Sequence, residues 1–339
     1  MSELANSSNS TPSNSQEAYP YFLIINGYLA ILLGYVAAFI FLYFVIRKSH
    51  SVRPLRLILF VSVFVNLYTL NAVVFVPARV RLNDGVQMFV FRGLPQLFSP
   101  EVQWFFLFFP HTMTTLPSAA LPVELWVRLH ILKHRVPPSS RQFAWIIFLT
   151  ALLVSLGATV IPFDYYFHIN NQIDYTNLWF NVTPTPVILA SDYKRNTISK
   201  IFAVYRSLLS VGSFILAILI ATWSHYLMKL KAVKLSNKTK LLVTEYSRSV
   251  FVQLLIPIFT YLFPIFAMFM SIIGYQVPYH DMILSILFIW SPFVSSASYL
   301  FLLGCYRQLM FLAIRNMLNL IGINLPKEQT AIQVISKTT

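Results

Sequence analysis

Long runs of apolar residues recur seven times along the chain, separated by short polar segments. They cover residues 22–46, 55–77, 102–127, 143–162, 201–227, 249–275 and 282–304. Each run is close to the roughly 20 residues that a helix needs to cross a bilayer. Hydrocarbon offers the backbone no hydrogen-bond partner, so such segments must be helical, and no alternating pattern of a membrane barrel is present. The pattern predicts an all-α bundle of seven transmembrane helices.

The connecting segments differ in charge on alternate sides of the predicted membrane. With the N-terminus outside, the inner segments hold 18 basic and three acidic residues, and the outer segments hold seven basic and eight acidic residues. Basic residues near span ends stay on the cytoplasmic side, so an outside N-terminus and an inside C-terminus are predicted. The net charge of +14 then requires no nucleic acid, because the inner residues face anionic membrane lipids.

Composition indicates one membrane domain, since 57% of the residues are hydrophobic and 11% are charged. Residues 1–21, rich in Ser and Asn, are expected to form a disordered extracellular N-terminus. Residues 22–304 form the bundle, and residues 305–339 are expected to form a cytoplasmic amphipathic helix and a short tail. Sequons make three asparagines candidates for glycosylation: Asn6, Asn9 and Asn181.

Cysteine usage limits how the outer loops can be held. Cys305 is the only cysteine, so the chain cannot form an internal disulfide and its outer loops must be ordered in another way. Cys305 lies at the inner end of the seventh span. It is either a palmitoylation site or a small residue that lets helices pack.

Titratable groups near the spans are few: His111, Glu124, His225 and Asp281. A transporter or pump usually places ionisable groups at mid-membrane, and only His111 lies well inside a predicted span. No histidine box, facing carboxylate pair or Gly-rich phosphate loop occurs. Gly-interrupted half-helices, typical of transporters, are also not visible. The sequence therefore predicts neither an enzyme nor a cofactor or metal site.

Prolines interrupt three of the predicted helices. The predicted kink positions are Pro117 in the third span, Pro257 and Pro264 in the sixth, and Pro292 in the seventh. Each proline removes a backbone hydrogen bond and can bend its helix. Either the bends only set a static shape, or they suit a bundle that opens at its inner face when a ligand binds outside.

Two charged residues stand at the inner end of the third span. Glu124 and Arg128 are four residues apart, so they share a helix face and can pair. The pair resembles a displaced form of the acidic-arginine lock of rhodopsin-like receptors. The alternative is that Arg128 only reaches toward the membrane interface.

The sixth span and the end of the seventh carry a family resemblance. Gln253, Ile256, Pro257, Tyr261 and Pro264 resemble a Q-x-x-I-P-x-x-x-x-x-x-P pattern, and Tyr306 with Arg307 resembles a Pro-Tyr-Arg ending. Both patterns are typical of the nematode serpentine chemoreceptors of the superfamily that contains the Str, Srh, Sri and Srd classes, with Srh favoured here. Cys305 stands where that superfamily has proline.

The resemblance implies a plasma-membrane receptor in the sensory cilium of chemosensory neurons, with a small external ligand and a heterotrimeric G protein as partners. A pocket between the outer halves of helices three, five, six and seven is expected to bind neutral or lipophilic molecules. Its candidate residues are Phe108, Phe109, Met113, Tyr205, Met268, Tyr275, Asp281 and Trp290. Candidates for G-protein coupling are Glu124, Arg128, Lys229, Lys231, Arg248, Tyr306 and Arg307. A ligand-gated chemosensory channel and a small-molecule or lipid transporter remain alternatives.

Overall fold

A computed structural model of the chain shows the fold. It describes the backbone of residues 14–47, 56–83, 85–91, 93–134, 136–179, 187–194, 196–231, 244, 251–252, 254–255, 258, 262–275 and 280–320. The side chains of some of these residues, among them 161–179 and Asp281, lie outside the description.

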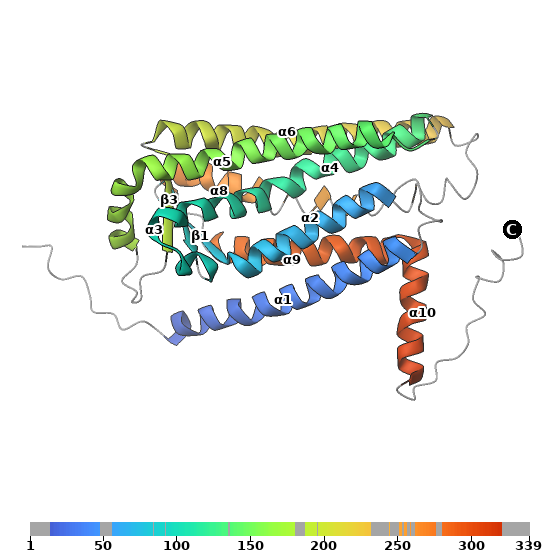
Figure 1. The fold of residues 1–339 in the computed structure, drawn as a ribbon, viewed down its shortest axis with the longest axis horizontal. Helices are drawn as coiled ribbons and strands as arrows, with labels where there is room; N and C mark the ends of the chain where they lie inside the picture. The colour runs from blue at the N-terminus through green and yellow to red at the C-terminus, as the bar shows by residue number, and fades with distance from the viewer. Residues whose placement is uncertain are drawn as a thin grey trace, which may run out of the picture.

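Long helices lie side by side and give the molecule an elongated shape (Figure 1). They are α1 (Asn14–Arg47), α2 (Arg56–Phe75), α4 (Phe108–His134), α5 (Ser140–Trp179), α6 (Thr197–Lys231) and α9 (His280–Leu302), with the shorter α8 (Phe263–Ile272). A short connection of η2 (Leu94–Leu97), α3 (Pro100–Gln103) and η3 (Trp104–Leu107) leads into α4. Six predicted spans thus coincide with long helices. In the sixth, α8 and residues 251–252 and 254–255 are described as helical.

Several helices extend beyond their predicted bounds. The first helix begins at Asn14, so residues 14–21, expected to be disordered, are helical. Likewise α5 continues to Trp179 and α6 begins at Thr197. Hydropathy predicts only the part of a helix that lies in hydrocarbon, whereas backbone hydrogen bonds continue the helix into water.

Among the described residues, five helices are long and apolar enough to cross a membrane: Ile25–Arg47, Arg56–Phe75, Ser140–Val160, Thr197–Met228 and Met282–Leu302. The more polar α4 is not among them, and it carries His111, Glu124 and Arg128. All three side chains are buried within the protein. A polar helix is tolerated here since its polar groups meet other helices rather than lipid.

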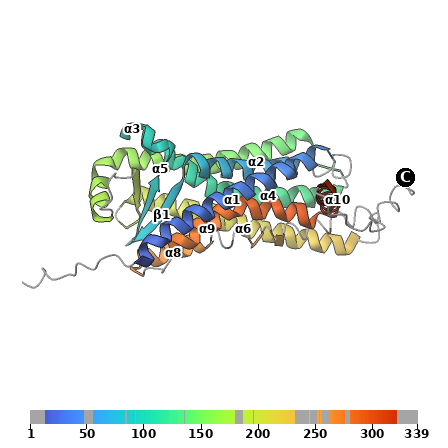
Figure 2. The ribbon, with the colours of Figure 1, turned by 90° about the horizontal axis from the view of Figure 1, so that it is seen from below.

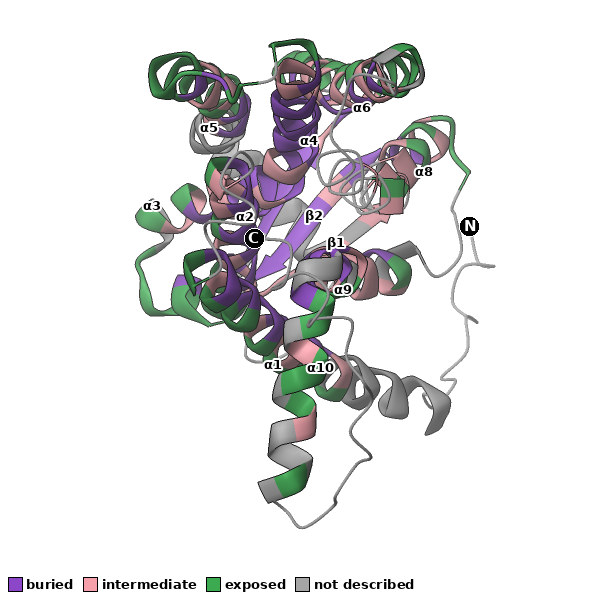
Figure 3. Cartoon of the chain, turned by 90° about the vertical axis from the view of Figure 1, so that its right-hand side faces the viewer, coloured by how far each residue is buried: buried purple, intermediate pink, exposed green. Residues whose placement is uncertain are grey.

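The polar α4 is the central helix of the bundle. It packs against α6, α5 and α2, while α1 packs against α9 and α2. Figure 3 shows α4 and strand β2 as mainly buried elements, with exposed residues along the outer helices. Large apolar side chains such as Leu208 and Phe64 are among the exposed ones, as expected where a helix surface is covered by lipid.

A small antiparallel sheet, which the all-α expectation did not include, closes one end of the bundle. Strands β1 (Ala78–Asn83) and β2 (Val86–Phe91) form a hairpin after α2, and β3 (Val187–Asp192) comes from the segment between α5 and α6. The order is β1-β2-β3, and Gln87 of β2 pairs with Ser191 of β3. Figures 1 and 2 show the sheet at the end of the bundle opposite to helix α10 (Gly304–Leu320). This end is the predicted outer side.

The sheet is anchored to the helices at its hairpin turn. Gly85 has a φ of 76°, a backbone conformation that glycine adopts without strain. Its N–H donates to Ser271 Oγ of α8 at 2.9 Å, and its carbonyl accepts from the Tyr193 N–H at 2.9 Å. On the face toward the helices, Phe89 and Phe91 join a core cluster with Leu107 and Phe202. Backbone pairing and packing thus connect the two predicted outer loops, a connection that a chain with one cysteine cannot make by a disulfide.

The register of β2 and β3 makes a direct test possible. We expect the double variant Gln87→Cys with Ser191→Cys to form a disulfide under mild oxidation, because paired strand residues have Cα atoms about 5 Å apart. The measurement is the gel mobility of the full-length protein with and without reductant. Met88→Cys with Ser191→Cys is the matched control, since residues 88 and 191 point to opposite faces. Equal crosslinking of both pairs would contradict the register.

At the other end, aromatic packing holds α9 and the first turn of α10 against α1. Tyr299 stacks on Phe41 with ring centroids 4.9 Å apart, and Tyr306 contacts Phe41 and Phe44 at 5.9 and 6.0 Å. Tyr299 and Tyr306 are fully buried in the largest core cluster. Helix α10 follows and runs across the direction of the bundle (Figure 1). A helix after the seventh span was expected, and the structure confirms it.

Candidate functional site

A buried carboxyl group joins three helices in the inner half of the bundle. Glu124 of α4 is 6% exposed, and its carboxyl accepts hydrogen bonds from Ser62 of α2 and Tyr299 of α9. The Tyr299 Oη to Glu124 Oε2 distance is 2.6 Å, and Ser62 Oγ lies 3.2 Å from Tyr299 Oη. Because buried polar groups are costly unless they are hydrogen-bonded, this network favours one arrangement of α2, α4 and α9.

One turn further along α2, a second set of hydrogen bonds extends the network. The amide of Asn66 donates to Ser295 Oγ at 3.2 Å and to Ser296 Oγ at 3.0 Å. Both serines belong to α9, and Ser296 is fully buried. Asn66 and Ser62 are four residues apart and therefore share one face of α2. We call Ser62, Asn66, Glu124, Ser296 and Tyr299 the inner polar network.

The expected pair of Glu124 and Arg128 is not what the structure shows. Both carboxyl oxygens of Glu124 are hydrogen-bonded to hydroxyls of other helices. Arg128 is 4% exposed, and its Nη2 lies 3.9 Å from the sulfur of Met228 on α6. Spacing along one helix permits the pair, but contacts to neighbouring helices decide where each side chain points.

The inner ends of the helices carry a mixed surface. Arg307 and Lys133 are exposed, whereas Tyr306 is buried and acts as a packing residue in this state. Partial burial lowers the pKa of His130, and the neighbouring His134 and Lys133 lower it further. The ring is therefore mainly neutral at neutral pH. The side chains of Lys229 and Lys231, and Arg248 as a whole, lie outside the described residues.

A second polar group lies beneath the sheet, in the predicted outer half. His111 of α4 is 1% exposed, and its ring meets Phe89 and Phe202 edge-on at 5.0 and 5.3 Å. Arg206 of α6 has Nη1 3.4 Å from His111 Nδ1, and its Nη2 donates to Thr114 Oγ1 at 3.1 Å. We call His111, Thr114 and Arg206 the outer polar cluster. Arg206 was one of the seven basic residues assigned to the outer side, but in the structure it belongs to α6 and contacts His111 and Thr114 of α4.

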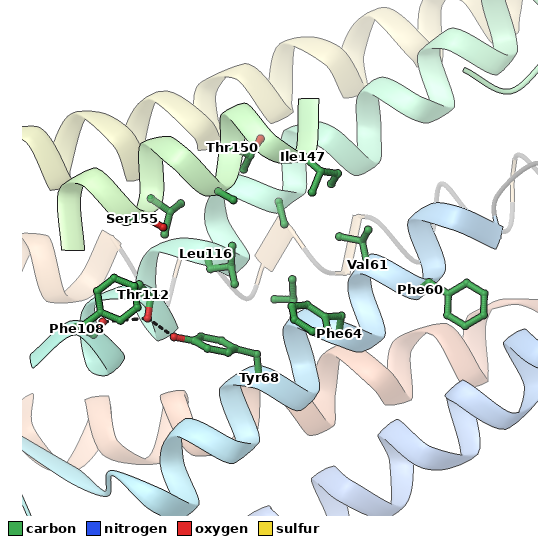
Figure 4. Close-up of a pocket in the computed structure, with 14 residues that line it drawn as sticks. Phe60, Val61, Phe64, Tyr68, Phe108, Thr112, Leu116, Ile147, Thr150 and Ser155 are labelled. Atoms are coloured by element: carbon green, nitrogen blue, oxygen red, sulfur yellow. Dashed lines mark hydrogen bonds between the residues drawn. The ribbon is translucent and has the colours of Figure 1, made fainter. Parts of the chain in front are cut away.

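An apolar cavity of about 470 Å³ lies between α2, α4 and α5 (Figure 4). The face of α4 that lines it repeats every four residues at Phe108, Thr112, Leu116 and Ala120. The other lining residues are Phe60, Val61, Phe64, Val65, Tyr68, Ile147, Thr150, Ala151, Val154 and Ser155. Figure 4 shows Tyr68 and Thr112 joined by a hydrogen bond. The size and apolar lining suit a small lipophilic molecule.

The eight residues expected to line one ligand pocket lie in several places. Met268 packs with Tyr193 and Ala203 beneath the sheet. Tyr205 faces α5, where its hydroxyl donates to the Leu153 carbonyl at 2.8 Å, and Trp290 donates to Asn26 of α1 at 3.2 Å. Phe108 lines the cavity between α2, α4 and α5, and Phe109 packs on Phe106. Met113 is half-buried and Tyr275 is exposed. The Asp281 side chain is not described.

Two of the expected kink positions fall inside described helices, Pro117 in α4 and Pro292 in α9. Pro264 stands in the first turn of α8. Pro257 lies outside the described residues, as do Asn6, Asn9 and Asn181, the glycosylation candidates. The Cys305 side chain is not described either. Bending and modification at these positions stay predictions.

The sequence pattern did not indicate roles for Ser62, Asn66, Tyr299 or Arg206. Nothing in the spacing of Ser62, Asn66 and Tyr299 indicates that they share a partner. For Arg206 a signal was present, because a basic residue six positions inside a predicted span is costly in hydrocarbon unless it faces the bundle.

Membrane-length helices packed around a polar central helix define a multi-pass membrane protein. The family model described as "Serpentine type 7TM GPCR chemoreceptor Srd" matches residues 23–311. The chain belongs to this family of chemoreceptors, which is not an enzyme family. The expected superfamily is confirmed, and the matched class is Srd rather than the favoured Srh. No curated protein matches the chain.

Proposed function

We propose that the chain is a G-protein-coupled chemosensory receptor that detects small lipophilic molecules outside the cell. The observation that carries this proposal is the Srd family match over residues 23–311. The buried polar groups of the described residues support it, since they connect helices to one another and form no catalytic set. Plasma membrane and sensory cilium are the locations that follow from a role in detecting external chemicals.

The ligand is proposed to bind in the outer half of the bundle, below the sheet. The site lies between the third, fifth, sixth and seventh spans, which correspond to α4, α6, α8 and α9. Of the expected lining residues, Met268 of α8 packs with Ala203 of α6 in this region, next to Tyr193. Phe202 of the same face of α6 contacts His111. The apolar cavity between α2, α4 and α5 is a second place of suitable size and lining for a lipophilic molecule.

Signalling is proposed to change the inner polar network and to expose a G-protein site. Glu124 joins α2, α4 and α9, so a shift of any one of these helices must break or rebuild its hydrogen bonds. Arg128 is buried beside Met228 of α6. It becomes available to a partner only if the inner end of α6 moves. Lys229, Lys231, Arg248 and Arg307 are the other proposed contacts.

The proposal predicts a calcium response to lipophilic odorants in cells that express the chain, and its loss when heterotrimeric G proteins are inactivated. Odorants of varied shape are applied to cells with and without the receptor. A ligand-gated channel would keep its response without G proteins, and a transporter would show uptake instead. Extracellular access of an antibody to a tag before Met1 separates the receptor from a channel with an inside N-terminus.

A further inference from the structure

The outer polar cluster is a set of hydrogen-bonded side chains within a largely apolar region. Arg206 Nη1 lies 3.4 Å from His111 Nδ1. A guanidinium nitrogen can only donate, so Nδ1 is the acceptor and the neutral ring carries its proton on Nε2. Nε2 is buried and has no hydrogen-bond partner in the described part of the chain. A buried N–H without an acceptor is unfavourable. Here this N–H belongs to the His111 ring, which also accepts a hydrogen bond from the Arg206 guanidinium.

The Thr114 hydroxyl does not supply the missing acceptor. Its oxygen accepts from Arg206 at 3.1 Å, and its proton goes to the His111 carbonyl at 2.9 Å. Thr115 uses the same carbonyl at 2.7 Å. The hydroxyls of Thr114 and Thr115 are therefore already hydrogen-bonded. An acceptor for the His111 Nε2–H must come from outside the cluster.

Arg206 faces the inside of the bundle. The buried residues of α6 recur at helical spacing and form one stripe: Ser199, Phe202, Ala203, Ser210, Ala217 and Ser224. Arg206 stands in this stripe, three residues after Ala203 and four before Ser210. Its side chain is half-buried, so part of it stays accessible. A cation inside a membrane bundle is costly, and such a residue usually has a functional partner.

The surroundings of the cluster are apolar and aromatic. Phe89 of the sheet and Phe202 of α6 cover two sides of the His111 ring, and both belong to the core cluster under the sheet. Ala203 lies one turn before Arg206 on α6, and Met268 of α8 packs in the same cluster as Ala203. A ligand that fits here has one acceptor group with negative charge and an apolar remainder.

We propose that the outer polar cluster binds the carboxylate of a small lipophilic monocarboxylic acid, with Arg206 and the His111 Nε2–H as donors. This deepens the proposed receptor function and rests on it. It also changes the expected ligand from a neutral molecule to an anion, because Arg206 lies against α4 inside the bundle.

The test compares straight-chain acids of about four to ten carbons with their methyl esters at neutral pH, where the acids are ionised. Full-length receptor is purified, and apparent affinity is measured by ligand-induced thermal stabilisation. We expect the acids to bind about tenfold or more tightly than the matched esters, because the esters carry no charge for Arg206. Equal binding of acids and esters, or no binding of either, would overturn the proposal.

Variants separate recognition from a structural link between α4 and α6. Arg206→Gln can still hydrogen-bond to Thr114, so we expect it to fold and to lose the preference for acids, whereas Arg206→Lys should retain part of it. Lys200→Gln removes the same charge at an exposed position of α6 and should keep the full preference. If Arg206→Gln keeps the preference, the cluster is structural. If Arg206→Gln does not fold, His111→Asn must lower the preference for acids, and an unchanged preference overturns the proposal.

Cell responses distinguish the proposed receptor function from the proposed carboxylate site. Responses to neutral odorants but not to acids would leave the receptor function standing and refute the carboxylate site. Acid binding to the purified protein without any G-protein-dependent response would support the site and contradict the receptor function.

Discussion

Arg128→Ala is expected to lower the G-protein-dependent response by about 30-fold while the receptor still reaches the cell surface. Arg128 lies at the inner end of α4 and is covered by Met228 of α6. In the proposed active state α6 has moved, and the guanidinium becomes a charged contact for the G protein. Loss of one partner of such a contact costs several kcal/mol in binding. The response is measured as intracellular calcium against ligand concentration.

Two controls make this result specific. Lys133→Ala removes a charge from an exposed position on the same helix and should leave the response within about twofold. Surface labelling shows whether each variant reaches the membrane. A full response from Arg128→Ala at normal surface levels would exclude Arg128 from signalling.

Glu124→Ala is expected to lower the free energy of unfolding by about 3 kcal/mol. The change leaves a cavity among α2, α4 and α9 and removes the acceptor of Tyr299 Oη. Both hydroxyls keep a partner, since Ser62 Oγ lies 3.1 Å from the Ile58 carbonyl and 3.2 Å from Tyr299 Oη. The loss is therefore smaller than if the two hydroxyls were left without partners. A fall of the apparent melting temperature on the order of 5 °C in detergent is the measurable result.

A double-mutant cycle shows whether the hydrogen bond itself causes the loss. Tyr299→Phe removes one donor to the carboxyl, and Glu124→Ala with Tyr299→Phe should cost less than the two single changes together. Glu124→Gln has the same size and hydrogen-bonding atoms, so we expect only a small loss. Strict additivity of the two single variants would contradict the network.

The expected Glu124–Arg128 pair shows why part of the candidate site could not be predicted. A helix places residues four apart on one face, which makes a pair possible. The competing partners of Glu124 are Ser62 and Tyr299, and Tyr299 is 175 residues further along the chain. Their closeness depends on how α2 and α9 pack against α4, which no local pattern specifies.

The three-stranded sheet is a similar case. Residues 78–83 and 86–91 are short, and half of the pairing of β2 is with β3 from another loop. Hydropathy alone does not distinguish short strands from irregular loops, and the single cysteine indicated only that another connection had to exist. The structure shows that this connection is backbone pairing with an anchor at Gly85.

The sequence by itself determined that this chain is a membrane bundle, that its long helices lie near the predicted spans, and that it resembles serpentine chemoreceptors. These properties depend on the length of apolar runs, the distribution of charge and short motifs, all of which act locally. Only the tertiary structure decided which polar side chains meet, namely Glu124 with Ser62 and Tyr299, and Arg206 with His111 and Thr114. The physical reason is that buried polar groups must find partners, and helix packing sets which partners lie within reach.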